Sequence, residues 1–226
     1  MKRQPDYSLC LVTDARLGGG RPLSDLVRAA VEGGVTLVQL REKDGSARSI
    51  LAQAAALRAL LAPRAVPLIV NDRLDLALAA GADGVHLGQG DLPCAVARRL
   101  AGPDFLLGVS VSSPAEAAQA ESEGADYLGV SPVFDTPTKR DTPSATGLAG
   151  LRAIRAATRL PLVAIGGIHA GNAAEVIRAG ADGVAVVSAI MAARDPRAAA
   201  HALAAAVFEG RGLGNQFAGR ERQAAE

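Results

Sequence analysis

Two carboxylates that follow two consecutive short apolar runs are the clearest chemical signal in this chain of 226 residues. The run 68–70 is closed by Asp72, and the run 84–87 is followed by Asp91. If the two runs are neighbouring parallel strands, both carboxylates emerge at the same rim, close enough to share one hard divalent cation. The pattern therefore predicts an active site with a bound metal ion.

Other polar residues follow the remaining apolar runs and extend this set. They supply cations for phosphate oxygens and neutral hydrogen-bonding groups for a heterocycle: Gln39, Arg41, Lys43, Asn71, Ser110, Thr136, Thr138 and Lys139. Mg²⁺ commonly uses one or two carboxylates together with the phosphates of its substrate. The set therefore fits a diphosphate held by Mg²⁺, and Mn²⁺ accepts similar oxygen ligands.

A second anion site is indicated by the Gly166-Gly167 pair after one strand and by Val187-Ser188 after the next. Glycine lets backbone N–H groups approach a phosphate closely, and the loops after strands seven and eight form the usual phosphate site of a (β/α)₈ barrel.

The elements that would position these residues alternate between short strands and Ala-rich helices. Eight strands are expected at 8–13, 36–40, 68–70, 84–87, 106–109, 127–130, 162–165 and 183–187, with helices including 24–32, 47–61, 114–123 and 172–179. Ser24, Ser46, Ser113 and Asn172 are the expected caps or near-caps of these helices. Eight βα units predict an α/β protein with a single-domain (β/α)₈ TIM barrel, and a doubly wound sheet is the alternative.

A Gly-Ala-Asp turn precedes three of the expected strands, and its aspartates are Asp83, Asp126 and Asp182. Glycine ends the preceding helix and aspartate leads into the strand, so these are αβ loops. They would lie on the face opposite the active site and are interpreted as structural.

Composition bounds the class of protein. Hydrophobic residues make up 49% and aromatics 3%, so the core must be built from Ala, Val, Leu and Ile. The net charge of +1 favours neither nucleic acid nor a membrane surface as a partner, and no apolar run reaches membrane-spanning length. A cytoplasmic protein is expected, with Cys10 and Cys94 as small buried residues.

The chain is expected to form one catalytic domain over 1–209, followed by a flexible polar tail over 210–226. The Pro- and Thr-rich connection 131–146 has the length of a lid or binding loop. Ala-rich helices would permit a homodimer.

The motifs, taken in order, resemble the thiamine phosphate synthase family. They are VTLVQLREK at 35–43, IVNDRLDLALAAGADGVHLGQGD at 69–91, GVS at 108–110, PVFDTPTK at 132–139, AIGGI at 164–168 and GVAVVSAI at 183–190. The resemblance implies an enzyme that condenses 4-amino-2-methyl-5-(diphosphooxymethyl)pyrimidine with a 4-methyl-5-(2-phosphoethyl)thiazole, including its carboxylated form. The products would be thiamine phosphate and pyrophosphate, formed after the diphosphate has departed.

Site residues carried over from the family fall into three groups. Lys43, Ser110 and Lys139 would be catalytic, and Asp72 and Asp91 would hold Mg²⁺. Substrates would be bound by Gln39, Leu40, Arg41, Glu42, Lys43, Asn71, Ser110, Thr136, Pro137, Thr138, Lys139, Gly167, Val187 and Ser188. Three positions depart from the family pattern: Gly90 replaces a frequent acidic residue, Ser112 a frequent His, and Ser131 a usual Gly.

Three alternatives share parts of this pattern. A thiazole tautomerase has the barrel and the phosphate site but lacks the intact Thr136–Lys139 segment. A ribulose-phosphate or tryptophan-pathway barrel isomerase needs the phosphate site but no carboxylate pair for Mg²⁺. A regulatory protein that only binds thiazole phosphate needs no metal to stabilise a leaving group.

Overall fold

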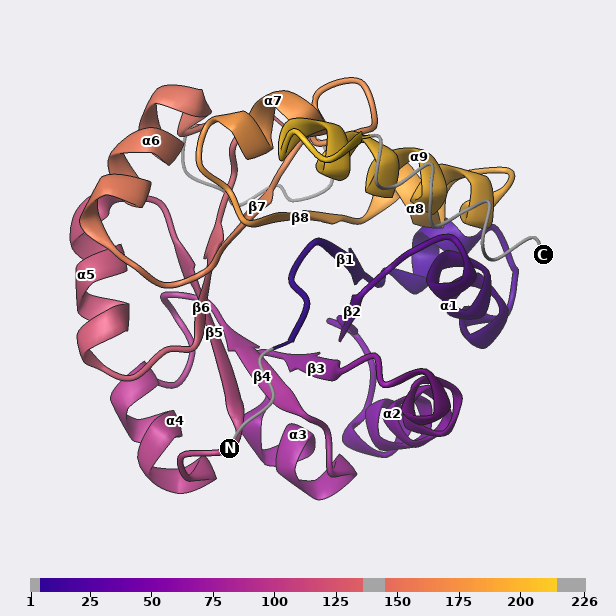
Figure 1. Ribbon diagram of the computed structural model, residues 1–226. Coiled ribbons are helices and arrows are strands. Elements are labelled where there is room, and N and C mark those ends of the chain that lie inside the picture. The colour runs from indigo at the N-terminus through magenta and orange to yellow at the C-terminus, as the bar shows by residue number, and fades with distance from the viewer. Residues whose placement is uncertain (1–4, 136–144, 215–226) are drawn as a thin grey trace.

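The computed structural model describes residues 5–135 and 145–214, and within them the predicted barrel is confirmed (Figure 1). The eight strands pair in chain order and close between β1 and β8, and every pairing is parallel. The strands are β1 (Leu9–Val12), β2 (Leu37–Leu40), β3 (Leu68–Asn71), β4 (Gly84–Leu87), β5 (Leu106–Val111), β6 (Tyr127–Val130), β7 (Leu162–Ile165) and β8 (Gly183–Val186). The doubly wound alternative is therefore excluded.

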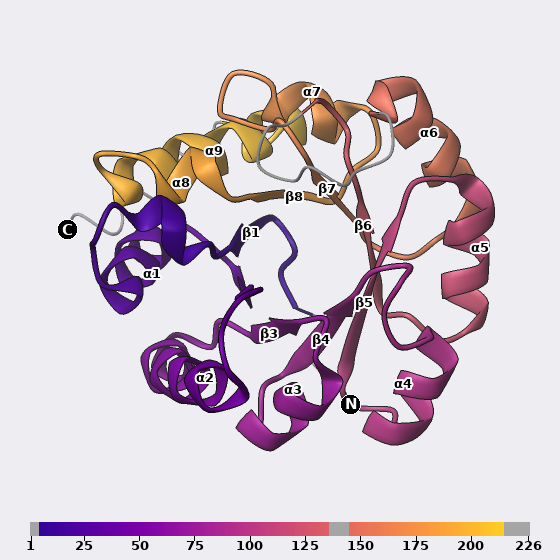
Figure 2. The ribbon, with the colours of Figure 1, turned by 180° about the vertical axis from the view of Figure 1, so that it is seen from behind.

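Helices surround the barrel in both views (Figures 1 and 2). They are α1 (Leu23–Glu32), α2 (Ala47–Leu61), α3 (Leu74–Ala80), α4 (Cys94–Ala101), α5 (Pro114–Ser122), α6 (Gly147–Ala157), α7 (Ala173–Arg178), α8 (Ser188–Met191) and α9 (Pro196–Gly210). Two short 3₁₀ helices, η1 (Ala15–Gly18) and η2 (Ala62–Arg64), add to them.

The predicted helix caps are only partly confirmed. The Ser46 and Ser113 hydroxyls accept hydrogen bonds from the backbone N–H groups at the starts of α2 and α5. Ser24 is wrong as a cap, because Pro22 is the N-cap of α1 and Ser24 lies inside the first turn. Asn172 occupies the N-cap position of α7 but makes no side-chain capping bond there.

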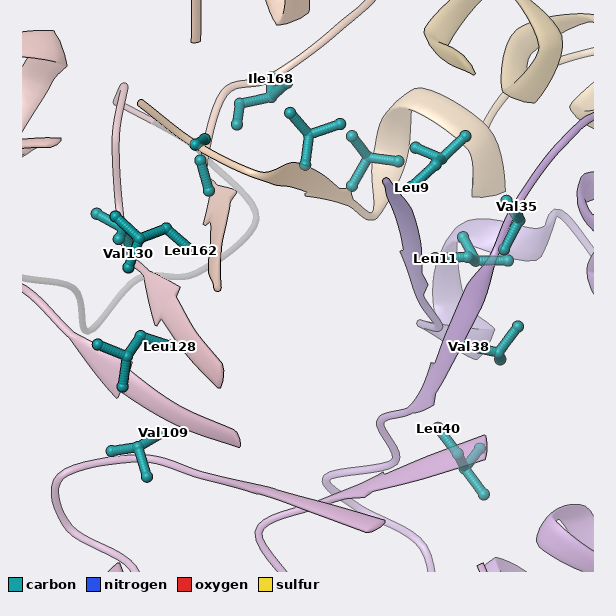
Figure 3. Close-up of a cluster of buried hydrophobic side chains, with 14 of the residues drawn as sticks. Leu9, Leu11, Val35, Val38, Leu40, Val109, Leu128, Val130, Leu162 and Ile168 are labelled. Carbon is teal, nitrogen blue, oxygen red and sulfur yellow. The ribbon is translucent and has the colours of Figure 1, made fainter. Parts of the chain in front are cut away.

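The core has two parts, and Ala, Val, Leu and Ile dominate both, as expected. The larger part fills the layer between strands and helices, where Leu9, Leu11, Val38 and Leu128 are fully or almost fully buried (Figure 3). The smaller part fills the barrel interior and includes Tyr7 and Tyr127. Each buried Leu or Val contributes about 2 kcal/mol to folding. This packing fixes the strand ends that carry the site.

The aspartates of the αβ turns have the predicted structural role. Asp83, Asp126 and Asp182 each accept a hydrogen bond of 2.8 Å from a backbone N–H at the start of a neighbouring strand, in its first or second residue. Asp126 also pairs with Arg98 at 2.7 Å, and Asp182 with Arg155 at 3.0 Å. Asp126 and Asp182 thus connect helices α4 and α6 to the sheet, on the face opposite the carboxyl ends of the strands.

Other features agree with the sequence where the structure describes them. Cys10 and Cys94 are free thiols and are buried. Within 5–135 and 145–214, no helix has both the length and the apolarity to span a membrane. The predicted tail lies mostly outside the described residues, which end at 214, and so do Thr136, Pro137, Thr138 and Lys139.

Candidate active site

A cavity of about 520 Å³ opens at the carboxyl ends of the strands. Its lining contains ten of the predicted residues: Gln39, Arg41, Lys43, Asn71, Asp72, Asp91, Ser110, Gly167, Val187 and Ser188. Two other predicted residues, Leu40 and Glu42, are not among the lining residues. Leu40 is buried in the layer between barrel and helices, whereas Glu42 lies beside a small neighbouring cavity.

Asp72 and Asp91 meet at this rim because β3 and β4 are parallel neighbours. The backbone N–H of Asp72 donates to the carbonyl of His86, and Asp91 Oδ2 accepts from the Gly88 N–H at 2.7 Å. Burial, the charge of Asp91 and a hydrogen bond between the two side chains raise the pKa of Asp72 to about 6. Two carboxylates held this close destabilise each other when both are ionised, and a cation between them would relieve the repulsion.

The backbone of Asp72 is also unusual, since its φ of 63° lies in the left-handed region. Asp and Asn tolerate this region better than other non-glycine residues. Strained backbone of this kind is typical of functional sites. It turns the chain sharply at the end of β3, where the carboxylate lines the cavity.

Arg41 and Lys43 bring positive charge to the same cavity. The backbone N–H of Arg41 donates to Thr13 Oγ1 at 3.0 Å, and its guanidinium lies 3.5 Å from the carboxylate of Asp14. Asp14 is only 4% exposed, and a hydrogen bond from Arg16 together with the charges of Arg16 and Arg41 lowers its pKa. The Asp14–Arg41 contact joins the segments that follow the paired strands β1 and β2, and the sequence did not predict it.

Ser110 on β5 is linked to two residues inside the barrel. Its Oγ lies 2.9 Å from His86 Nε2, and His86 Nδ1 lies 3.1 Å from the hydroxyl of Tyr127. His86 therefore lies between the buried Tyr127 and the cavity residue Ser110. The chain of three polar side chains runs from the cavity to the buried interior.

The glycine pair after β7 lies against the loop after β6. Gly166 and Gly167 have φ values of 107° and 63°, which side chains rarely adopt. A Cβ on Gly166 would lie 2.7 Å from Pro132 Cβ, so only glycine permits this packing. Asn172 Nδ2 donates to the carbonyl of Gly167 at 3.0 Å, which fixes the loop beside Ser188. Asn172 thus supports the cavity wall, a role that the sequence did not reveal.

The lining also includes residues that the sequence did not assign to substrates. His169 and Ile168 follow the glycine pair, Ser131 follows β6, and Ala189 follows Ser188. Ser131 is one of the three departures from the family pattern and contributes directly to the cavity. Ser112, another departure, donates its backbone N–H and hydroxyl to Glu116 at 2.5 and 3.0 Å.

The chain matches a family model described as thiamine monophosphate synthase over residues 9–190, which is most of its length. This chain belongs to the thiamine monophosphate synthase family. The predicted family resemblance is therefore confirmed.

Curated relatives agree with this family membership. A thiamine-phosphate synthase of Albidiferax ferrireducens is 60% identical over 192 residues, covering 85% of this chain and 88% of the relative. One of Moorella thermoacetica is 53% identical over 208 residues, covering 92% and 99%.

Among solved structures, a thiamine phosphate pyrophosphorylase from Pyrococcus furiosus matches with a TM-score of 0.84 and 43% identity. The match covers 91% of this chain and 98% of that one.

Proposed function

We propose that the cavity joins a pyrimidine diphosphate to a thiazole phosphate, giving thiamine phosphate and pyrophosphate. Membership of the thiamine monophosphate synthase family supports this reaction, and the relatives named thiamine-phosphate synthase are transferases by that activity. The observation that carries the proposal is that the pair Asp72 and Asp91 lines one cavity together with Arg41 and Lys43, whose charges act on Asp72. The thiazole tautomerase and the regulatory protein are not supported by any of the relatives described above.

The pyrimidine diphosphate would occupy the half of the cavity near β2, β3 and β5. Arg41 and Lys43 would bind its phosphate oxygens, and the side chains of Gln39 and Asn71 would orient the pyrimidine. In the reaction the bond between the pyrimidine methylene carbon and its bridging oxygen breaks, and the diphosphate keeps the electron pair. The ring nitrogen of the thiazole then donates the pair that forms the new C–N bond. Fixed cations around the departing polyanion stabilise this separation of charge.

The carboxylate pair fits Mg²⁺. No group of three or more His, Cys, Asp or Glu side chains among the described residues could hold a metal ion, so the protein offers two carboxylates and no complete cage. Mg²⁺ suits such a site because the phosphates of its substrate complete its coordination. When bound, the ion would neutralise charge on the leaving diphosphate. Mn²⁺ would be accepted by the same oxygens.

The thiazole phosphate would bind between the loops after β7 and β8. Gly167, Val187 and Ser188 line this half of the cavity. Helix α8 begins at Ser188 in this half of the cavity. The first backbone N–H groups of a helix have no acceptors within the helix, and they suit a phosphate. Thr136, Thr138 and Lys139, which the family resemblance places near the two phosphates, stay predictions, as do the cytoplasmic location and the homodimer.

The substitution Asp72→Asn tests the division of the cavity. Asn keeps the size and the tolerance for left-handed backbone of Asp72 but removes its charge. Turnover should fall at least about 100-fold, as expected when a charge that stabilises a transition state is lost. Calorimetric titration with the thiazole phosphate should give an unchanged Kd. Unaffected turnover would contradict the metal assignment, and a large loss of thiazole phosphate affinity would contradict the separation of the two subsites.

A further inference from the structure

His86 lies at the centre of a polar chain that reaches from the barrel interior to the cavity. Its Nδ1 faces the Tyr127 hydroxyl at 3.1 Å, and its Nε2 faces Ser110 Oγ at 2.9 Å. The heavy-atom positions fit two neutral tautomers, one with the proton on Nδ1 and one with it on Nε2. The two tautomers would leave Ser110 with opposite hydrogen-bonding roles.

Space for the imidazole ring is created by two glycines, Gly108 on β5 and Gly129 on β6. A Cβ on Gly108 would lie 2.5 Å from His86 Nδ1 and 2.2 Å from Tyr127 Cζ, and one on Gly129 would lie 2.8 Å from His86 Cε1. Neither glycine has the left-handed φ that would otherwise explain its presence. β5 and β6 therefore carry glycine, with no side chain, where the ring of His86 lies. The close packing holds the ring in one orientation.

The Tyr127 hydroxyl, at the buried end of these three polar side chains, determines which nitrogen of His86 carries the proton. Tyr127 is 3% exposed and its ring packs against Tyr7 with centroids 5.0 Å apart. Burial raises the pKa of the Tyr127 hydroxyl well above its ordinary value, so this hydroxyl keeps its proton. A buried O–H requires an acceptor, and the facing His86 Nδ1 becomes one when it carries no proton.

We propose that Tyr127 holds His86 in the Nε2–H tautomer, so that His86 donates to Ser110 Oγ and the Ser110 hydroxyl donates its own proton into the cavity. His86 and Tyr127 are then positioning residues that make Ser110 a hydrogen-bond donor. This inference rests on the proposed binding of an anionic diphosphate beside Ser110, since a phosphate oxygen accepts a hydrogen bond and cannot donate one when ionised.

The tautomer can be measured directly by long-range ¹⁵N–¹H correlation spectra of protein labelled in histidine. The chain has three histidines, which makes the spectrum tractable. Protonated and unprotonated nitrogens of a neutral imidazole are distinguished by their ¹⁵N shifts. The His201→Gln variant assigns one ring and serves as a control with unchanged turnover, because His201 is exposed on α9, away from the cavity. We expect the proton on Nε2 in the wild type and loss of that preference in Tyr127→Phe; a proton on Nδ1 in the wild type overturns the proposal.

Kinetics of a matched pair of variants provide the second test. The Gln side chain is one methylene longer than Asn, so in His86→Gln an amide N–H reaches the place of Nε2, whereas in His86→Asn it reaches only the place of Nδ1. Ser110→Ala and His86→Asn should each lower kcat/KM for the pyrimidine diphosphate by about 10- to 100-fold, the effect of losing one hydrogen bond to a charged group. His86→Gln should recover most of that loss.

A double variant separates positioning from a merely structural role. If His86 acts through Ser110, the double variant His86→Asn/Ser110→Ala should be no slower than the slower single variant. Multiplied losses, or a Gln variant as slow as the Asn variant, would overturn the proposal. The proposed reaction fails on a different result, the absence of thiamine phosphate formation by the wild type, and the tautomer spectrum does not depend on turnover.

Discussion

The carboxyl groups of Asp72 and Asp91, which follow the neighbouring strands β3 and β4, line the same cavity at the rim of the barrel. The burial of Asp72 and the repulsion between the two carboxylates raise the pKa of Asp72 to about 6. A pair of this kind lowers the stability of the fold for as long as no cation lies between the two groups. The arrangement therefore suits the binding of a cation and of a polyanionic substrate better than it suits stability.

Replacing Asp72 should stabilise the protein when Mg²⁺ is chelated. The raised pKa means that the folded state binds more protons than the unfolded state between the ordinary carboxyl value of 3.8 and about 6. Ionised Asp72 thus costs stability above pH 6, and the cost disappears as the pH falls toward 4. Asp72→Asn should raise the free energy of unfolding by about 1 kcal/mol at pH 7.5, after allowance for solvent screening, and by nothing at pH 4. Urea denaturation at the two pH values checks this, and an equal gain at both would contradict it.

Asp14 should matter for substrate binding although its carboxylate is buried beside the cavity. Asp14→Asn keeps the acceptor for the start of η1 but removes the ion pair with Arg41. With Arg41 less firmly oriented, KM for the pyrimidine diphosphate should rise about tenfold, as expected for a weakened hydrogen bond to a charged group. The control is Arg16→Ala, which removes the other partner of Asp14. The Arg16 side chain is 66% exposed. Equal effects of the two substitutions would show that the Arg41 contact is unimportant.

The stability contribution of Asp14 should have the opposite pH dependence to that of Asp72. Its pKa is lowered, chiefly by the hydrogen bond from Arg16, so its contribution is present above the ordinary carboxyl pKa and is lost as the pH falls. The difference in stability between the wild type and Asp14→Asn should therefore shrink toward acid pH. A difference that grows toward acid pH would contradict this assignment.

Gly90 lies where a carboxylate could be added beside Asp91. A Cβ at Gly90 would meet no atom within 4 Å, and the residue is exposed. Gly90→Asp should lower the Mg²⁺ concentration needed for half-maximal activity about two- to fivefold, the modest effect expected of an exposed charge. Gly90→Asn is the control for size. Identical Mg²⁺ dependence of all three proteins would show that this departure from the family pattern has no consequence for the metal.

Asp126 should affect stability without affecting catalysis. Asp126→Ala leaves the backbone N–H of Leu107 and the guanidinium of Arg98 without this acceptor, which should lower the free energy of unfolding by about 2 kcal/mol. Asp25→Ala, which breaks an exposed pair with Arg28, should cost less than about 0.5 kcal/mol. Values of kcat and KM should stay unchanged in both. A specific loss of kcat in Asp126→Ala would contradict the structural role of the αβ turns.

The strands were predictable because each is a short apolar run followed by polar residues or glycine, and three of them also follow a Gly-Ala-Asp turn. β4, β6 and β7 have the predicted bounds, and five others differ by one or two residues. The start of α1 was less predictable, since the N-cap is Pro22 and the helix already begins at Leu23, one residue before Ser24. By residue type Ser24 is the better candidate for the N-cap, and only the conformation of the first helical turn shows that Pro22 is the cap.

Contacts between distant parts of the chain were the hardest to predict. Asp14 and Arg41 are 27 residues apart and meet only because β1 pairs with β2. The space for the His86 ring depends on Gly108 and Gly129, which lie on two other strands. The family motifs identified ten of the residues that line the cavity, but the supporting contacts required the three-dimensional arrangement.

Pyrophosphate release is the measurement that tests the central claim most directly. The purified protein is supplied with the pyrimidine diphosphate and Mg²⁺, with and without the thiazole phosphate. The account predicts release that requires both substrates and stops when a chelator removes the metal ion. Release without the thiazole phosphate would instead indicate a hydrolase in which water captures the pyrimidine cation, and no release despite thiazole phosphate binding would contradict the synthase reaction.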